Sequence, residues 1–252
     1  MLTLVDLGAI FWEFRFGTGS SVEAYSLTLD KIQFYIRNWP KVVVCCDSPK
    51  SKRKEWCPDY KSNRKPKPTD GIEALESVPD RVRAWGNPVV QCEGYEADDI
   101  IAALVAQSWP EEVQIVGSAK GCEKDFYCLL DDRVRLVGSV GYITANDCVT
   151  KFGVAPSQMQ DWLALVGDAA DAIPGCPGIG PSKATLLLEM FGTIEGVKAA
   201  SDEELLALPK FGKKTVESIR SWDPTMARKL VKLLDDAPVS LAELFSPGPT
   251  HT

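Results

Sequence analysis

Three short runs of apolar residues in the first half of the chain constrain the fold more than any other feature. These runs are LTLVDL, KVVVCC and VQIVG. Strands that are apolar at nearly every position are covered on both faces, as in parallel sheets. The predicted strands span 2–7, 41–46, 88–92, 113–117 and 133–137, and helical patterns between them span 21–38, 71–85 and 96–107. This alternation predicts an α/β fold with a mostly parallel central sheet flanked by helices.

The sequence changes character near Thr144, where short helical patterns punctuated by Gly and Pro replace the strands. We predict an α/β core over residues 1–143, a helical region over 144–245 and a frayed tail over 246–252. In the helical region, the turn PGCPGIG lies between two apolar helices, which is typical of a helix-hairpin-helix. A second basic turn, PKFGKK at 209–214, could add to DNA binding, but a plain connection between helices is the favoured interpretation.

The composition excludes several kinds of chemistry. The single histidine, His251, lies near the end of the chain, and the eight cysteines include no C-x-x-C pair. His-assisted nucleophilic catalysis and a zinc site are therefore disfavoured, and reduced thiols suit the cytoplasm. No apolar run reaches the roughly 18 residues of a membrane span. We also recognise no signal peptide at the N-terminus. We expect a cytoplasmic monomer with no membrane partner.

Acidic residues follow the ends of four successive predicted strands. They are Asp6, Asp47, the group Glu96, Asp98 and Asp99, and the pair Glu123 and Asp125. One such acid is usually a turn or capping residue, but sites in open α/β sheets form at the carboxyl ends of the strands. Asp168 and Asp171 would share one helical face if that turn is helical. So many carboxylates would repel unless hard divalent cations compensated them, and two such ions can hydrolyse a phosphodiester without histidine.

A strongly basic segment stands out on an acidic chain of net charge −7. Residues 50–67, KSKRKEWCPDYKSNRKPK, hold eight Lys or Arg against two Asp or Glu. Taken alone, such a segment is equally a solvated, flexible loop. Directly after Asp47, however, residues 48–70 would form a basic arch over the acidic edge. Its cations could neutralise phosphates, while Trp56 and Tyr60 stack unpaired bases.

The hairpin provides a second signal for DNA. Gly178 and Gly180 allow a tight turn whose backbone N–H groups approach a phosphate, and the helix that begins at Pro181 favours an anion at its N-terminus. Lys183 adds a positive charge. A Gly-rich turn alone is weak evidence. Together with the flanking apolar helices it indicates sequence-independent binding to a duplex backbone.

The chain resembles a known family in the order of its motifs. VDLGAIFWEF, CDSPKSKRKEWCPDYKSNRKPKP, EGYEADDIIAALV, EKDFYCLL and VGDAADAIPGCPGIGPSKATLLLEMFG occur in the order found in flap endonucleases. Over roughly residues 2–235 the chain is similar to the 5′-nuclease domain of bacterial DNA polymerase I and to stand-alone phage 5′ nucleases. The resemblance implies a PIN-like fold and Mg²⁺-dependent hydrolysis of DNA at 5′ flaps, junctions and duplex ends, with 5′→3′ exonuclease action. It also implies that Mn²⁺ substitutes and that a separate DNA polymerase is a partner.

The resemblance also assigns roles to individual residues. It implies two or more metal ions held by Asp6, Asp47, Glu96, Asp98, Asp99, Glu123, Asp125, Asp168 and Asp171. It places Arg53, Tyr60 and Lys61 over the active site as catalytic residues. The DNA-binding residues that follow from the arch and the hairpin are Lys52, Arg53, Lys54, Lys61, Arg64, Lys65, Gly178, Gly180 and Lys183. The hairpin of this family also holds a K⁺ ion.

The sequence departs from the family in two places. The family has Asp-x-Asp directly after the fourth strand, whereas here SAKGC precedes Glu123-Lys124-Asp125. The family's usual Asn after the last metal-binding Asp is Ala172 here. A branched-DNA-binding protein that has lost catalysis is therefore one alternative, and a related metal-dependent ribonuclease is another.

Overall fold

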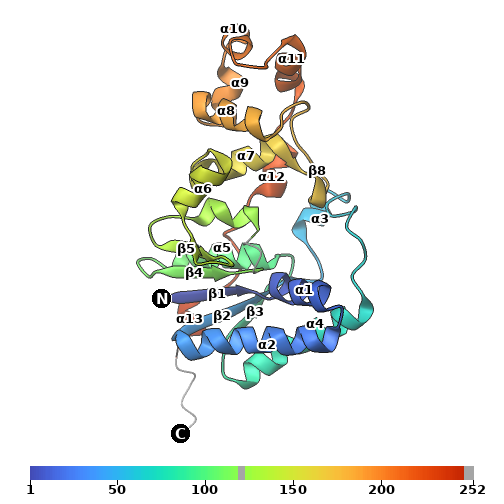
Figure 1. Cartoon of the computed structure of the whole chain (residues 1–252), viewed down its shortest axis with the longest axis vertical. Coiled ribbons are helices and arrows are strands. Elements are labelled where there is room, and N and C mark those ends of the chain that lie inside the picture. The colour runs from blue at the N-terminus through green and yellow to red at the C-terminus, as the bar shows by residue number, and fades with distance from the viewer. Residues whose placement is uncertain (119–122, 247–252) are drawn as a thin grey trace. The chain divides into compact units, whose positions relative to one another are not determined.

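The computed structural model describes residues 1–118 and 123–246, so the predicted tail beyond residue 246 lies outside the described residues. It divides into two compact units, each built from separate stretches of sequence (Figure 1). The sheet unit comprises Met1–Lys52, Lys65–Thr144 and the chain from Leu233 onward, and the helical unit comprises Arg53–Arg64 and Ala145–Lys232. No helix in the described ranges is long and apolar enough to cross a membrane.

The sheet unit contains a six-stranded sheet with the strand order β3-β2-β1-β4-β5-β6. Its strands are β1 (Leu2–Asp6), β2 (Lys41–Cys46), β3 (Val89–Gln91), β4 (Val113–Val116), β5 (Val134–Val137) and β6 (Tyr142–Ile143). The pairings are parallel except for β6, which runs antiparallel to β5. The predicted parallel sheet is confirmed. β6 is not among the predicted strands, because two residues are too few to show a period.

Helices cover both faces of this sheet, with α2 and α4 on one face and α5 on the other (Figure 1). The helical elements of the sheet unit are α1 (Leu7–Thr18), α2 (Ser21–Asn38), α4 (Thr69–Ala84), α5 (Ala97–Gln107), η1 (Lys124–Leu129) and α13 (Leu241–Leu244). α1 is not among the predicted helices. Its start is nevertheless defined by Asp6, whose side chain accepts the backbone N–H of Ala9, and its end by Gly19 in the left-handed region.

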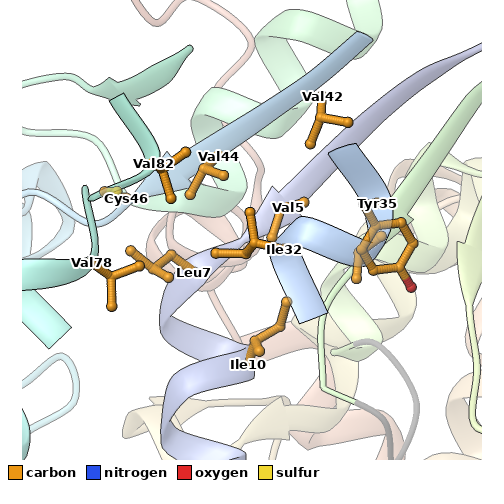
Figure 2. Close-up of a cluster of buried hydrophobic side chains, with 11 residues drawn as sticks. Val5, Leu7, Ile10, Ile32, Tyr35, Val42, Val44, Cys46, Val78 and Val82 are labelled. Carbon is orange, nitrogen blue, oxygen red and sulfur yellow. The ribbon is translucent and has the colours of Figure 1, made fainter. Parts of the chain in front are cut away.

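The core between the sheet and α2 follows from the alternation of side chains along each strand. Val5 of β1 pairs with Val44 of β2, and both side chains lie in one buried cluster with Ile32 of α2 and Val78 of α4 (Figure 2). The neighbouring residue Val43 points to the opposite face, which α5 covers. Burial on both faces explains why these strands are apolar at nearly every position.

The helical unit consists of short helices joined by tight turns. They are α6 (Ala145–Phe152), η2 (Pro156–Gln158), α7 (Met159–Val166), η3 (Ala169–Asp171), α8 (Pro181–Phe191), α9 (Ile194–Ala199), α10 (Asp202–Leu206), α11 (Lys213–Ser221) and α12 (Thr225–Val231), and most of α3 (Lys52–Trp56) belongs here too. Between α7 and α8, β7 (Gly167–Asp168) pairs antiparallel with β8 (Ile173–Pro174). Asp168 ends β7 and is the N-cap of η3, a single 3₁₀ turn whose last residue is Asp171, so the turn between the two acids is 3₁₀-helical and not part of an α-helix.

The segment from Leu233 to Ser246 returns to the sheet unit and is called the C-terminal strap here. Leu234 donates its backbone N–H to Asp99 Oδ1 at 2.8 Å, and the Tyr95 hydroxyl donates to the Asp236 carbonyl at 3.1 Å. The Gln107 side chain bonds backbone groups farther along the strap. The strap therefore differs from the predicted boundary, which assigned residues up to 245 to the helical region. The hydrogen bonds that hold it join side chains of the sheet unit to its backbone groups, which leave no signal in the sequence.

The β7–β8 hairpin offers a test of the helical unit. A Cβ atom on Gly175 would lie 2.4 Å from the Val166 carbonyl carbon and 2.5 Å from the Gly167 nitrogen. Because backbone cannot move aside cheaply, Gly175→Ala should lower the free energy of unfolding by about 2 kcal/mol or more. Gly180→Ala is the matched control, since a Cβ there has no heavy atom within 4 Å. Equal urea midpoints for the two variants would contradict this packing.

Candidate functional site

The acidic edge of the sheet unit lies at the carboxyl ends of adjacent parallel strands. Asp6 is the last residue of β1 and pairs in register with Cys45, so that Asp47 follows at the end of the neighbouring strand. The segment after β3 leads into α5, whose first residues carry Glu96, Asp98 and Asp99. Since β3, β2, β1 and β4 are successive neighbours, the predicted gathering of strand ends occurs within this unit.

Asp6 and Asp47 face a common point, which the absence of a side chain on Gly8 leaves open. A Cβ atom built on Gly8 would lie 3.3 Å from Asp47 Oδ2 and 3.6 Å from Asp6 Oδ1. Asp6 is buried, whereas Asp47 is exposed. Two carboxylates directed at one point repel each other unless a cation lies between or beside them. The arrangement therefore fits a hard divalent cation, which one or two carboxylates and several waters commonly hold.

Backbone hydrogen bonds orient both carboxylates. Ala9 in the first turn of α1 donates to Asp6 Oδ1 at 2.9 Å, and Ala97 in the first turn of α5 donates to Asp47 Oδ1 at 2.9 Å. The N-termini of two helices thus stabilise negative charge at this edge through their orphan N–H groups and dipoles. Main-chain donors thus help to hold both side chains in place.

The acids at the start of α5 take different roles. Glu96 is buried, and its Oε1 accepts the Ser51 hydroxyl at 3.1 Å. Asp99 is fully buried, and its two oxygens accept backbone N–H groups, from Glu96 at 3.1 Å and from Leu234 of the strap at 2.8 Å. Asp99 therefore fastens the strap to the helix start, which is a structural role beside the predicted one. Asp98 is half-buried and accepts the backbone N–H of Asp99 at 2.8 Å.

Outside residues 119–122 and 247–252, no three Asp, Glu, Cys or His side chains converge closely enough to form a metal centre by themselves. The segment after β4 contributes an exposed Glu123 and a half-buried Asp125, which lies in η1. The residues that connect β4 to Glu123 include the four that lie outside the described ranges. Metal ligation by these acids stays a prediction.

The two thiols that end β2 are buried. Burial raises the pKa of Cys46 to about 12, and the neighbouring Asp47 carboxylate adds to the shift. Burial also raises the pKa of Cys45 well above its ordinary value. Both thiols are therefore protonated at neutral pH in the metal-free protein, and the carboxylate oxygens at this edge are the donors that a hard cation prefers.

In the helical unit the predicted acids lie beside the basic segment. Asp171 is buried, and its Oδ1 accepts Arg64 Nε at 2.8 Å and a second contact from Arg64 Nη2. Lys61 donates its backbone N–H to the Asp171 carbonyl at 2.9 Å. Asp168 is half-buried, and its Oδ1 accepts the backbone N–H of Ala170 at 2.9 Å. One predicted DNA-binding arginine is thus an ion-pair partner of a predicted metal ligand.

Arg53 is placed differently from the prediction. It is 2% exposed, and its guanidinium donates to the carbonyls of Leu230 at 2.9 Å and Lys232 at 2.7 Å. These are carbonyls that the end of α12 leaves without intrahelical partners. Tyr60 is also buried, at 3% exposure, so it offers no free face for base stacking. The two residues predicted to face DNA instead anchor the basic segment within the helical unit.

The remaining basic residues of the segment are accessible to different extents. Lys54 and Lys65 are exposed, whereas Lys61 is partly buried and its ammonium lies 4.8 Å from the centre of the Tyr60 ring. Lys52 belongs to the sheet unit, where its ammonium lies 3.6 Å from the centre of the Tyr95 ring. Exposed lysines therefore flank the buried residues Arg53 and Tyr60 in the basic segment.

The hairpin at 176–180 has the geometry that its glycines predicted. Gly178 adopts a φ of +78°, and Gly180 is the N-cap of α8 with an extended backbone. A Cβ on either glycine would meet nothing within 4 Å, so both backbones are open to close approach. Lys183 is half-buried, and its ammonium donates to the Gly178 carbonyl and to Thr215 Oγ1, each at 3.1 Å.

The buried position of Arg53 yields a prediction. Arg53→Met should destabilise the protein by about 3 kcal/mol, because it leaves buried carbonyls at the end of α12 without donors. Lys54→Gln is the control, since Lys54 is the adjacent, exposed residue of α3 and its change should leave the thermal midpoint nearly unaltered. A thermal midpoint for Arg53→Met that equals the control would show that Arg53 is free, as the sequence analysis supposed.

Two family models match consecutive parts of the chain. Residues 9–153 match the 5′-3′ exonuclease N-terminal resolvase-like domain, and residues 154–247 match the 5′-3′ exonuclease C-terminal SAM fold. The chain is 31% identical to a 5′-3′ exonuclease of Aquifex aeolicus over 80% of this chain and 68% of that protein. It is 37% identical to the flap endonuclease Xni of Vibrio campbellii over 67% of this chain and 64% of that protein.

A solved structure shares the fold. The bacteriophage T5 flap endonuclease, in a pseudo-enzyme-product complex with DNA and metal ions, superposes with a TM-score of 0.74 at 22% identity, covering 93% of this chain and 88% of that one. Relatives named DNA polymerase I are much longer, and the chain spans 19% of the one from Deinococcus radiodurans. Because both family models match in sequence order and together span most of the chain, this protein belongs to the 5′-3′ exonuclease family.

Proposed function

We propose that the protein is a structure-selective 5′ nuclease that hydrolyses DNA phosphodiesters at 5′ flaps, junctions and duplex ends and also degrades DNA in the 5′→3′ direction. The observation that carries this proposal is the pair of carboxylates, Asp6 and Asp47, directed at the open point above Gly8. The relatives named 5′-3′ exonuclease and flap endonuclease support it, as does a structural neighbour that holds DNA and metal ions.

The donor set supports Mg²⁺ as the cofactor, with Mn²⁺ able to substitute. The carboxylates at the sheet edge offer oxygen only, and the nearby thiols stay protonated. We propose Asp6 and Asp47 as the primary ligands. Further ligands would come from the other predicted acids, which are Glu96, Asp98, Asp99, Glu123, Asp125, Asp168 and Asp171. Divalent ions at such a site supply an activated water and stabilise the leaving oxygen of a phosphodiester.

The chain's own residues would bind and orient the DNA. The exposed cations of the basic segment, Lys54 and Lys65 among them, would neutralise phosphates, and the open backbone of the hairpin at 176–180 would approach a duplex strand. Arg64, now paired with Asp171, would have to exchange that partner to contact DNA. A K⁺ ion at the hairpin, a separate polymerase partner, a monomeric state and a cytoplasmic location stay predictions.

The direct test is cleavage of a labelled 5′-flap DNA in Mg²⁺, with and without EDTA. We expect cleavage that chelation abolishes and that Asp47→Asn or Asp168→Ala slows by at least about a hundredfold, since each removes a charged oxygen from the proposed metal site. Asp30→Asn, at an exposed position on α2, should cleave at the unaltered rate. Flap binding without cleavage at any Mg²⁺ or Mn²⁺ concentration would indicate the non-catalytic alternative, and preference for RNA flaps would indicate the ribonuclease.

A substitution at Gly8 should change metal binding without lowering the stability of the protein. Gly8→Ala would place a methyl group 3.3 Å from Asp47 Oδ2, so it should weaken Mn²⁺ binding, measured by calorimetry, by about tenfold. The same change should not destabilise α1, because alanine is the better helix former by roughly 1 kcal/mol. Gly17→Ala in the same helix meets nothing within 4 Å and should leave Mn²⁺ binding unaltered. Equal Mn²⁺ affinity for both variants would contradict the proposal that the metal binds beside Gly8, between Asp6 and Asp47.

A further inference from the structure

The turn between α10 and α11 repeats the backbone of the first hairpin. Lys210 has a φ of +64°, as Gly178 has a φ of +78°, although only glycine adopts this region without strain. Two residues later, Gly212 caps α11 with a φ of −125° and a ψ of 174°, as Gly180 caps α8 with a φ of −101° and a ψ of −176°. The two turns therefore have the same conformation at corresponding positions.

The hydrogen bonds of the two turns correspond as well. In the first hairpin, Ile179 donates its backbone N–H to the Cys176 carbonyl at 3.0 Å, and in the second, Phe211 donates to the Leu208 carbonyl at 3.2 Å. All four of these side chains are buried. The carbonyl of each capping glycine then accepts two backbone N–H groups from the first turn of the helix that follows. The turn at 208–212 is thus a second hairpin and not the plain connection that its sequence suggested.

Lys183 ties the two hairpins together. Its ammonium bonds the Gly178 carbonyl of the first hairpin and Thr215 Oγ1 of α11, each at 3.1 Å, and lies 5.3 Å from the centre of the Phe211 ring. The first helices after the two turns, α8 and α11, are therefore in direct contact through this side chain. Both turns lie on the same part of the helical unit.

The charges of the second hairpin are unfavourable for an isolated helix. Lys210, Lys213 and Lys214 are exposed, and the first turn of α11 has no acidic residue. A helix N-terminus favours negative charge, so lysines there oppose the dipole, and Lys210 is in addition strained. A bound anion would relieve the repulsion among these lysines and their conflict with the helix dipole. A nucleic-acid backbone offers a series of such anions to two adjacent hairpins.

We propose that the second hairpin, residues 208–215, is a further duplex-DNA contact, in which Lys210, Lys213 and Lys214 bind phosphates beside those bound by the first hairpin. This inference rests on the proposed function, since it assigns another part of the surface to the same substrate. It predicts that the helical unit binds a longer stretch of duplex than one hairpin reaches.

The test is equilibrium binding of a fluorescent flap DNA with a long duplex arm, measured by anisotropy without divalent ions over a range of KCl concentrations. The variant carries Lys210→Gly, Lys213→Gln and Lys214→Gln. It should fold, because glycine relieves the strained backbone at position 210. We expect about tenfold weaker binding at moderate salt. We also expect the salt slope, which is the slope of the logarithm of the binding constant against the logarithm of the KCl concentration, to fall in magnitude by about 0.9 for each phosphate that the variant no longer neutralises. The control carries Lys151→Gln, Lys229→Gln and Lys232→Gln, three exposed lysines of the same unit.

The outcomes are distinct. A lower salt slope for the hairpin variant alone supports the proposal. An unaltered slope, or an equal reduction in the control, overturns it while flap cleavage by the unmodified protein leaves the proposed function intact. If the unmodified protein neither binds the duplex nor cuts the flap, both proposals fail.

Discussion

The parallel pairing of β1 with β2 is the constraint on which the site depends. Parallel strands end at the same edge, so the register that pairs Asp6 with Cys45 brings the carboxylates of Asp6 and Asp47 to one point. This pairing requires strands that are apolar on both faces, and the core between the sheet and α2 meets that requirement. The charged edge is therefore stabilised by the hydrophobic layers behind it, and the N-termini of α1 and α5 hold its two acids with backbone donors.

The sheet and the acidic edge could be predicted because both leave periodic or positional signals. Apolar runs mark the buried strands, and the residue after a strand end is the residue at the edge. The glycines of the hairpin at 176–180 were equally informative, since a φ of +78° at Gly178 is a conformation that sequence alone associates with glycine. Gly8 carried no such signal. Its importance comes from the space above it, which only the three-dimensional structure shows.

Side-chain environments could not be predicted to the same depth. Arg53 lies among lysines in the sequence, yet its guanidinium is buried against carbonyls that lie almost 180 residues farther along the chain. Asp99 and Leu234 are joined in the same long-range way. The second basic turn was interpreted first as a plain connection because Lys210 stands where the first hairpin has glycine, so the sequence does not indicate that the two backbones are alike. In each case the decisive partner is a main-chain atom, and main-chain atoms are identical in every sequence.

The discontinuity of the two units has a consequence for the order in which the chain acquires structure. During synthesis the N-terminal segments emerge first, and domains generally fold as units. Every residue of the helical unit precedes Leu233, whereas the sheet unit still lacks the strap that bonds Asp99, Tyr95 and Gln107. The acidic edge, although encoded in the first half of the gene, is thus the last region to receive its full set of contacts. A nascent chain would therefore carry both hairpins of the helical unit before the acidic edge has all of its contacts.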